Sequence, residues 1–288
     1  MTATLQFIRL HGCGNDYAFI DCINSPTPSH PQTLARQLSD RRRSVGGDGL
    51  VLMLPPGNTA HHGRMRMFNA DGSEGSLCGN ALRCMALWLH KNRLAPPLMT
   101  LEMGARTFDA EVLRMDPGER LSGSVRITLP PPRFLRPDQN WPACLSRDIA
   151  IPDVHVPGLL RNPQIADPGN PHLILFINSL PEIPVESLGP VLENHPAFPD
   201  RTNVEFTEIL HSNHARVRVW ERGSGETLAC GSGACAVAMA GAAAGLFDPA
   251  HPVDIRMPGG TLAVLLRPDG KTFLEGPAEE SCRGSVFL

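Results

Sequence analysis

Lysine is scarce in this sequence of 288 residues, which contains 2 lysines among 26 basic residues. An enzyme that uses pyridoxal phosphate needs a lysine to form its Schiff base. Lys91 lies near the end of an expected helix and Lys271 follows an Asp-Gly turn, so neither has a phosphate-binding context. P-loop and dinucleotide-binding fingerprints are also missing. We therefore expect no organic cofactor.

Long apolar runs are missing as well. The longest, Ala234 to Phe247, is shorter than the roughly 20 residues of a membrane-spanning helix. The first ten residues lack the apolar core and the cleavage site of a signal peptide. A net charge of −3 and a pI of about 6.4 give no basic surface for nucleic acid. We expect a cytoplasmic location and neither a membrane nor a nucleic-acid partner.

The 8 cysteines lack the usual spacings of metal and redox motifs. In the cytoplasm we expect them to be reduced thiols. Cys78 and Cys84, like Cys230 and Cys235, lie farther apart than the paired ligands of a zinc site, and no histidine cluster is adjacent. We therefore expect no metal site. Cys84 and Cys235 lie among apolar residues and are expected to be inert packing residues.

Two of the cysteines belong to a duplicated pattern. The sequence DGSEGSLCGNALRC covers Asp71 to Cys84, and GSGETLACGSGAC covers Gly223 to Cys235. One constant offset pairs Glu74 with Glu226, Cys78 with Cys230 and Gly79 with Gly231. Small and apolar residues at helical spacing follow each Cys-Gly pair. Each thiol is therefore expected at the start of a helix.

Three further pairs of segments follow the same order: GNDY (14–17) with GNPH (169–172), MRMFNADG (65–72) with VRVWERGS (217–224), and MGARTFDA (103–110) with MPGGTLAV (257–264). Coincidence among Gly-rich turns would explain one such pair but not four. The length also agrees with two domains of roughly 100–200 residues each. We interpret the chain as two homologous halves.

The coarse secondary structure is α+β, with more strand than helix. Helices are expected at residues 31–42, 78–94 and 185–194 and after Cys230, with short strands elsewhere. The Pro-rich segment Pro130–Pro142 predicts the joint between the halves. A basic run, Arg41 to Arg43, is interpreted as a solvated helix end. The last residues, 285–288, would suit a strand that returns to the first half.

The two Cys-Gly turns predict acid–base chemistry at a carbon next to a carboxylate. The first N–H groups of a helix have no partner inside the helix and carry partial positive charge. They are expected to lower the pKa of each cysteine and to hold a carboxylate. One thiolate could then remove an α-proton while the other thiol donates a proton to the opposite face. That pairing would invert a stereocentre.

Eight motifs, in order along the chain, resemble those of the diaminopimelate epimerase family over essentially the whole length: HGCGND (11–16), VGGDGL (45–50), MFNADGSE (67–74), CGN (78–80), GNPH (169–172), TNVEF (202–206), ERGSGET (221–227) and ACGSGA (229–234). The resemblance implies a cofactor-independent epimerase that interconverts LL- and meso-2,6-diaminopimelate, a precursor of lysine and peptidoglycan. It implies two α+β domains, residues 1–128 plus 277–288 and residues 129–276. Each is a mostly antiparallel sheet wrapped around a central helix, with the active site in the cleft between them. It also implies a homodimer.

Residue roles follow from the matched motifs. Cys78 and Cys230 would be the acid–base thiols, and His172 and Glu221 would tune their pKa values. The resemblance assigns the substrate contacts to Asn15, Asn69, Gly79, Asn80, Asn170, Asn203, Glu221, Arg222, Gly231 and Ser232. Arg222 would bind the distal carboxylate.

Three residues depart from the family pattern. Ala81 stands where glycine usually follows CGN, Tyr17 replaces the usual phenylalanine, and Gly49 stands where some members have glutamine. These changes leave open a related racemase or epimerase of histidine or hydroxyproline type. A non-catalytic amino-acid-binding protein and a thiol redox sensor are the alternatives from other classes. Retention of both Cys-Gly turns with their Glu and His neighbours argues against a binding protein.

Overall fold

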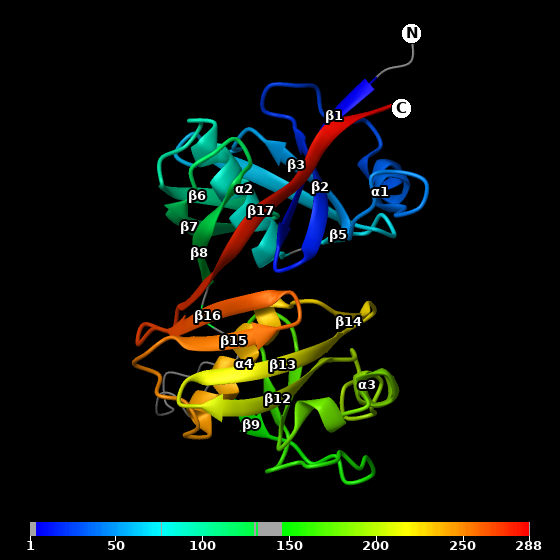
Figure 1. Cartoon of the computed structure of the whole chain (residues 1–288), viewed down its shortest axis with the longest axis vertical. Helices are drawn as coiled ribbons and strands as arrows, with labels where there is room; N and C mark the ends of the chain where they lie inside the picture. The colour runs from blue at the N-terminus through cyan, green and yellow to red at the C-terminus, as the bar shows by residue number, and fades with distance from the viewer. Residues whose placement is uncertain (1–3, 76, 130, 132–145, 288) are drawn as a thin grey trace. The chain divides into compact units, whose positions relative to one another are not determined.

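The computed structural model describes residues 4–75, 77–129, 131 and 146–287 (Figure 1). All of the Pro-rich segment Pro130–Pro142 except Pro131 therefore lies outside the described residues. The chain divides into two compact units. Unit 1 is Met1–Thr128 with Glu275–Leu288, and unit 2 is Leu129–Leu274.

Unit 1 contains the first ten elements and most of the last strand. They are β1 (Thr4–Gly12), β2 (Asn15–Asp21), α1 (Pro31–Ser39), β3 (Gly49–Leu54), β4 (Gly63–Asn69), β5 (Glu74–Gly75), α2 (Gly79–Lys91), β6 (Leu98–Met103), β7 (Arg106–Met115), β8 (Ser122–Leu129) and β17 (Thr272–Phe287).

The strand pairings of unit 1 close on themselves. In order they run β17–β1, β1–β2, β2–β3, β3–β4, β4–β6, β6–β7, β7–β8 and β8–β17. These eight strands therefore form a closed barrel, in which β2–β3 and β4–β6 are parallel. Helix α2 contacts β1, β2, β4, β6 and β7, and every residue from Asn80 to Leu89 is buried.

Unit 2 contains the remaining elements. They are β9 (Arg147–Asp148), β10 (Gln164–Ala166), β11 (His172–Ile177), the 3₁₀ turn η2 (Leu180–Glu182), α3 (Val185–Glu193), β12 (Asn203–His211), β13 (His214–Glu221), β14 (Gly225–Thr227), α4 (Gly231–Ala243), β15 (Val253–Met257) and β16 (Gly260–Leu266).

The same order of pairing recurs in unit 2. Strands β11 and β12 are parallel, as are β2 and β3. The antiparallel pair β12–β13 and the parallel pair β13–β15 repeat β3–β4 and β4–β6. Helix α4 contacts β10, β11, β12, β15 and β16, and its residues from Gly233 to Gly241 are buried. Each unit therefore presents one buried helix that begins directly after a cysteine.

The expected elements agree with those observed, with shifts at their ends. The helix expected at 31–42 ends at Ser39, because Asp40 has an extended backbone and its carboxylate accepts hydrogen bonds from the backbone N–H groups of Arg42 and Arg43. The short strands β5 and β14 were not expected, since two or three residues carry no periodicity. Within the described residues, no helix is long and apolar enough to span a membrane.

Candidate active site

Cys78 lies at the N-cap position of α2. Its backbone is extended, with φ −145°, and its Sγ accepts a hydrogen bond from the N–H of Ala81 at 3.4 Å. The thiol donates toward the side-chain oxygen of Asn15 at 3.7 Å and toward the hydroxyl of Tyr17 at 3.6 Å. Cys78 is half-buried. Its sulfur lies at a helix N-terminus and has polar neighbours from β2.

The Asn15 side chain is held in one orientation. Its Oδ1 atom accepts a hydrogen bond from Asn80 Nδ2 at 3.1 Å, and its Nδ2 atom donates to Asp48 Oδ2 at 2.7 Å. Asn80 is fixed in turn by the buried guanidinium of Arg83, which donates to Asn80 Oδ1 at 2.6 Å. Gly12 makes room for this guanidinium, since a Cβ at Gly12 would lie 2.7 Å from Arg83 Nη2. Asn15, Asn80 and Cys78 thus form one hydrogen-bonded group.

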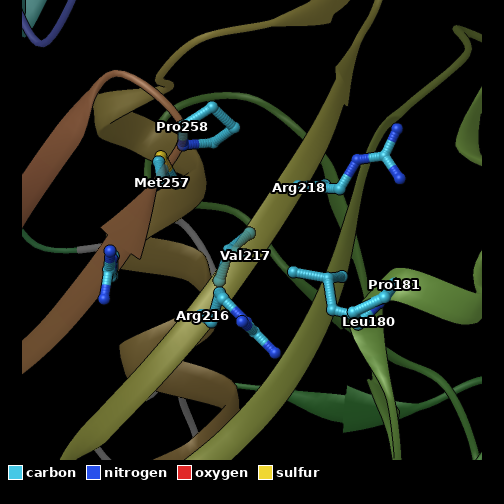
Figure 2. A pocket seen from close by; sticks show the side chains of 8 residues that line it. Leu180, Pro181, Arg216, Val217, Arg218, Met257 and Pro258 are labelled. Atoms are coloured by element: carbon cyan, nitrogen blue, oxygen red, sulfur yellow. The ribbon is translucent and has the colours of Figure 1, made fainter.

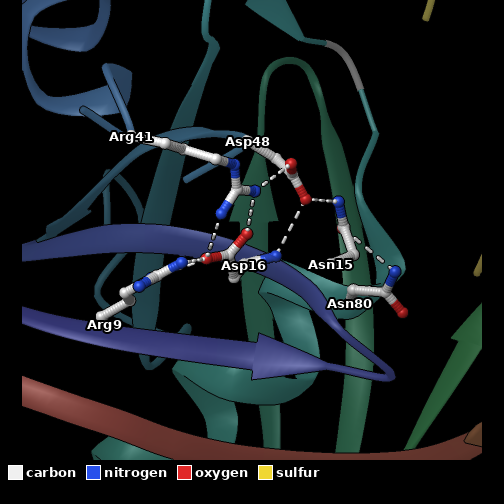
Figure 3. A network of polar contacts seen from close by, with 6 residues as sticks. All are labelled: Arg9, Asn15, Asp16, Arg41, Asp48 and Asn80. Carbon is white, nitrogen blue, oxygen red and sulfur yellow. Dashed lines mark hydrogen bonds and ion pairs between the residues drawn. The ribbon is translucent and has the colours of Figure 1, made fainter. Parts of the chain in front are cut away.

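A network of charged side chains supports Asn15 from behind (Figure 3). Asp48 accepts from the backbone N–H of Asp16 at 3.0 Å, and Arg41 donates to Asp16 at 2.7 Å and to Asp48 at 2.9 Å. Arg9 also pairs with Asp16. The basic run is exposed just after the end of α1, in agreement with its interpretation as a solvated helix end. Arg41, whose side chain is 53% exposed, in addition pairs with Asp16 and Asp48. These ion pairs of Arg41 could not be predicted from the sequence, because Asp16 lies far away along the chain and Asp48 lies beyond a turn.

Cys230 occupies the equivalent N-cap position of α4. Its Sγ accepts from the N–H of Gly233 at 3.3 Å and lies 3.4 Å from the hydroxyl oxygen of Ser232. Burial raises the pKa of Cys230 well above its ordinary value, and the carboxylates of Glu221 and Glu205 raise it further. The expectation of a lowered pKa is therefore wrong here. Loss of water and two nearby negative charges outweigh the helix N-terminus.

Glu221 is the last residue of β13 and lies beside Cys230. Burial raises the pKa of its carboxyl group, while contacts with the Thr227 hydroxyl and with His172 lower it. The Thr227 hydroxyl donates to Glu221 Oε1. Glu221 is therefore a carboxyl group whose charged form is disfavoured by its surroundings, next to a thiol in the same condition.

His172 begins β11 and is completely buried. Its Nδ1 lies 2.6 Å from Glu205 Oε1, and its Nε2 lies 3.1 Å from Asn170 Oδ1. Parallel pairing of β11 with β12 brings His172 and Glu205 together. Glu205 is also completely buried, and its Oε2 has no described hydrogen-bond partner. Sequence reasoning did not assign Glu205 a role, although the motif TNVEF contains it.

The remaining predicted substrate contacts lie at strand ends. Asn203 Oδ1 accepts from the backbone N–H of Arg222 at 2.9 Å, and the Arg222 guanidinium donates to the carbonyl of Asp200 at 2.9 Å. Asn69, at the end of β4, donates to Ser73 Oγ at 2.9 Å. No described hydrogen bond joins Asn69 to the Cys78 group. Asn69 is the register partner of Gly49, and Gly49 is that of Tyr17, so Asn69 lies at the same end of the sheet.

The predicted residues fall into two clusters, one in each unit. Cys78, Gly79, Asn80 and Asn15 lie at the start of α2 in unit 1. Cys230, Gly231, Ser232, Glu221, His172, Asn170, Asn203 and Arg222 belong to unit 2, around the start of α4 and the adjoining strand ends. Among the described residues, no group of three or more His, Cys, Asp or Glu side chains could hold a metal ion.

One pocket of unit 2 adjoins this cluster but contains none of its residues (Figure 2). Met257 in its lining accepts a hydrogen bond from the backbone N–H of Cys230 at 3.3 Å. It is lined by Leu180, Pro181, Arg216, Val217, Arg218, Arg256, Met257 and Pro258. Arg216 and Arg218 are already paired with Glu208 and Glu226, at 2.7 Å and 2.6 Å. No predicted site residue lines the pocket, so we do not assign the chemistry to it.

Solved structures with the same fold include proteins that are named for different functions. A phenazine biosynthesis protein of the PhzF family from Bacillus anthracis has a TM-score of 0.71 and 16% identity, and the match covers 99% of this chain and 100% of that one. A hydroxyproline epimerase from Agrobacterium vitis has a TM-score of 0.63 and 15% identity, with 100% and 94% covered. At such identities the likeness establishes the fold alone.

Sequence comparison identifies the family. The model of diaminopimelate epimerase matches residues 7–112 and 165–280. A diaminopimelate epimerase from Desulforudis audaxviator is 42% identical, over 96% of this chain and 97% of that protein. Another from Moorella thermoacetica is 37% identical, over 99% and 100%. This chain therefore belongs to the diaminopimelate epimerase family.

Proposed function

We propose that this protein is a diaminopimelate epimerase, an isomerase that interconverts the LL and meso forms of 2,6-diaminopimelate. Family membership over nearly the full length supports this function. The observation that carries the chemistry is the equivalence of Cys78 and Cys230, each of which precedes a buried helix and accepts the N–H three residues later. Such a pair suits proton transfer at one carbon by two bases.

In the proposed mechanism one cysteine acts as a base and the other as an acid. The thiolate takes the proton from the α-carbon, whose electron pair becomes a carbanion stabilised by the bound carboxylate and ammonium. The opposite thiol then donates its proton to the other face, which inverts the centre. The first cysteine ends as a thiol and the second as a thiolate, so the enzyme is ready for the reverse reaction. No redox change or cofactor is needed.

The raised pKa of Cys230 supports its role as the acid in one direction. Burial and the two carboxylates keep Cys230 protonated near neutral pH. We therefore propose that Cys78 removes the proton when Cys230 supplies one, with Glu221 and His172 tuning the thiols. Bound substrate would counter the effect of the two carboxylates on Cys230, because its ammonium group can neutralise nearby carboxylates.

The first-turn N–H groups of α2 and α4 are proposed to hold the reacting carboxylate. Gly79 and Asn80 would supply those of α2, and Gly231 and Ser232 those of α4. Preorganised donors of this kind stabilise the negative charge that develops in the transition state. The polar contacts proposed for the rest of the substrate are Asn15, Asn69, Asn170, Asn203 and Glu221, with Arg222 binding the distal carboxylate.

The arrangement of the halves is also a proposal. Inversion needs bases on opposite faces of one carbon, so we propose that both clusters act in one cleft between domains 1–128 plus 277–288 and 129–276. Each sheet is proposed to wrap around its helix, and the domains to close on the substrate and expel water. Small-angle scattering checks the closure. Identical profiles with and without a substrate analogue would refute it.

The cellular location and the oligomeric state of the protein remain proposals. The mechanism needs both cysteines reduced, which favours a cytoplasmic location. A homodimer is expected from the family resemblance. The substrate is a small amino acid in either case.

Proton NMR of the reduced protein with LL-diaminopimelate in D₂O, without pyridoxal phosphate, tests the function. We expect the α-proton signal of the substrate to disappear as the meso isomer forms. Exchange with histidine or hydroxyproline but not with diaminopimelate would keep the chemistry and change the substrate. No exchange with any of these amino acids would refute the proposal.

A further inference from the structure

The Tyr17 hydroxyl contacts the sulfur of Cys78. Tyr17 lies on β2, the residue is 6% exposed, and its hydroxyl oxygen is 3.6 Å from Cys78 Sγ. We propose that Tyr17 is a positioning residue that stabilises the thiolate of Cys78 through this hydrogen bond. As a step in epimerisation the inference rests on the proposed function, although the hydrogen bond itself does not.

A hydroxyl can serve both protonation states of the cysteine. It accepts a hydrogen bond from the thiol and, after a rotation of its own proton, donates one to the thiolate. The nearby Asn15 Oδ1 atom can only accept, and Asn15 cannot turn its amide group without losing its bonds to Asp48 and Asn80. Tyr17 thus complements the Ala81 N–H, which also donates to the sulfur.

The position of the ring depends on Gly49. Tyr17 and Gly49 are register partners in the parallel pair β2–β3. A Cβ at Gly49 would lie 2.0 Å from the carbonyl oxygen of Phe68 and 3.1 Å from Tyr17 Cε1. Any side chain at position 49 would therefore collide with the backbone and press on the ring. The two departures from the family pattern at positions 17 and 49 thus belong together structurally.

Other charged and titratable groups surround this part of unit 1. Burial raises the pKa of Tyr17 well above its usual range, and the neighbouring Cys78 and Asp48 raise it further. Arg41 bonds the carboxylates of Asp48 and Asp16 and moderates their charge. Other titratable groups on β2 and the adjoining elements include Arg9, His11, Cys13, Asp21, Arg83, Cys84 and Glu279. The Tyr17 hydroxyl therefore stays protonated, and can donate a hydrogen bond, at a pH at which Cys78 ionises.

The sequence offers a sharp test, because Tyr17 is the only tyrosine in the chain. Growth on 3-fluorotyrosine changes the acidity of this one hydroxyl with almost no change in shape. The matched control is the Tyr17→Phe protein grown in the same fluorotyrosine medium. This protein has no tyrosine position and therefore incorporates no fluorotyrosine. The rate of iodoacetamide reaction at Cys78 would be measured against pH by peptide mass spectrometry, without substrate.

We expect the Tyr17→Phe profile to move to higher pH by about one unit, as for loss of one hydrogen bond to a charged group. The fluorotyrosine protein should move to lower pH, because a more acidic hydroxyl is a stronger donor. Coincident profiles, or a Tyr17→Phe shift without an opposite shift in the fluorotyrosine protein, would overturn the proposal. A packing role alone would not produce opposite shifts.

Catalysis provides a separate readout. In Tyr17→Phe we expect kcat at neutral pH to fall about tenfold with KM little changed, since the thiolate population falls by that factor for one pKa unit. Failure of the proposed function would appear as no turnover in either protein while the alkylation profiles still differ. Equal kcat values in two active proteins would contradict the role of Tyr17 in epimerisation.

Discussion

The substitution Glu205→Gln is expected to lower the pH at which Cys230 becomes reactive. A Cβ at Gly233 would lie 2.7 Å from Glu205 Oε1 and 3.4 Å from Cys230 Sγ, so these two atoms are at most about 6 Å apart. Both side chains are buried, which limits screening by solvent.

The size of the effect follows from this separation. At this upper limit of about 6 Å, two unit negative charges repel by about 3 kcal/mol at an effective dielectric constant of roughly 20, which corresponds to about two pKa units. A protonated His172, 2.6 Å from Glu205, would cancel part of this repulsion. We therefore expect a downward shift of about one to two pH units.

The assay is the pH dependence of iodoacetamide reaction at Cys230, followed by peptide mass spectrometry. Glu208→Gln is the matched control, because Glu208 lies on the same strand three residues later and pairs with Arg216. The control profile should coincide with that of the unmodified protein. An unchanged or upward-shifted profile in Glu205→Gln, with the fold intact by circular dichroism, would refute the reasoning.

Three further predictions concern the thiols and their packing. Cys78→Ala and Cys230→Ala should each keep the fold and lose epimerisation by orders of magnitude; near-normal turnover in either would contradict the two-base assignment. Burial raises the pKa of Cys84 to about 12 and that of Cys230 well above its ordinary value, so the folded protein keeps protons that the unfolded chain loses above pH 9.0. The free energy of unfolding should therefore fall by ~1.4 kcal/mol per pH unit and group above that pH, and constant denaturant midpoints there would contradict this sign. Gly49→Ala should destabilise the protein by about 1–3 kcal/mol through overpacking, and an unchanged unfolding midpoint would show that the backbone can yield.

Local sequence patterns predicted most helices and strands because their periodicity is strong. Helix α4 could be expected from a run of small and apolar residues after Cys230, and the structure places Cys230 at its N-cap. The same reasoning placed Cys78 before α2. Strands β5 and β14 were missed, since their pairing depends on a neighbouring strand rather than on their own residues.

The electrostatics of the site could not be predicted in the same way. A helix N-terminus is a local feature, and it alone suggested a lowered pKa for Cys230. The opposing carboxylate of Glu205 reaches Cys230 only through the pairing of β11 with β12 and the packing of α4. Arg41 likewise meets Asp16 through tertiary contact. Burial and long-range partners therefore decide what the motif alone leaves open.

The fate of solvent deuterium tests the two-base mechanism most directly. A thiolate that removes the α-proton becomes a thiol whose single proton came from the substrate. It therefore has no solvent deuteron to return to the same face before inversion. In D₂O at early times, we predict deuterium at the inverted α-carbon of meso-diaminopimelate and none in the recovered LL substrate. Deuterium in the recovered LL substrate at the same rate, or product that retains the original proton, would contradict the account.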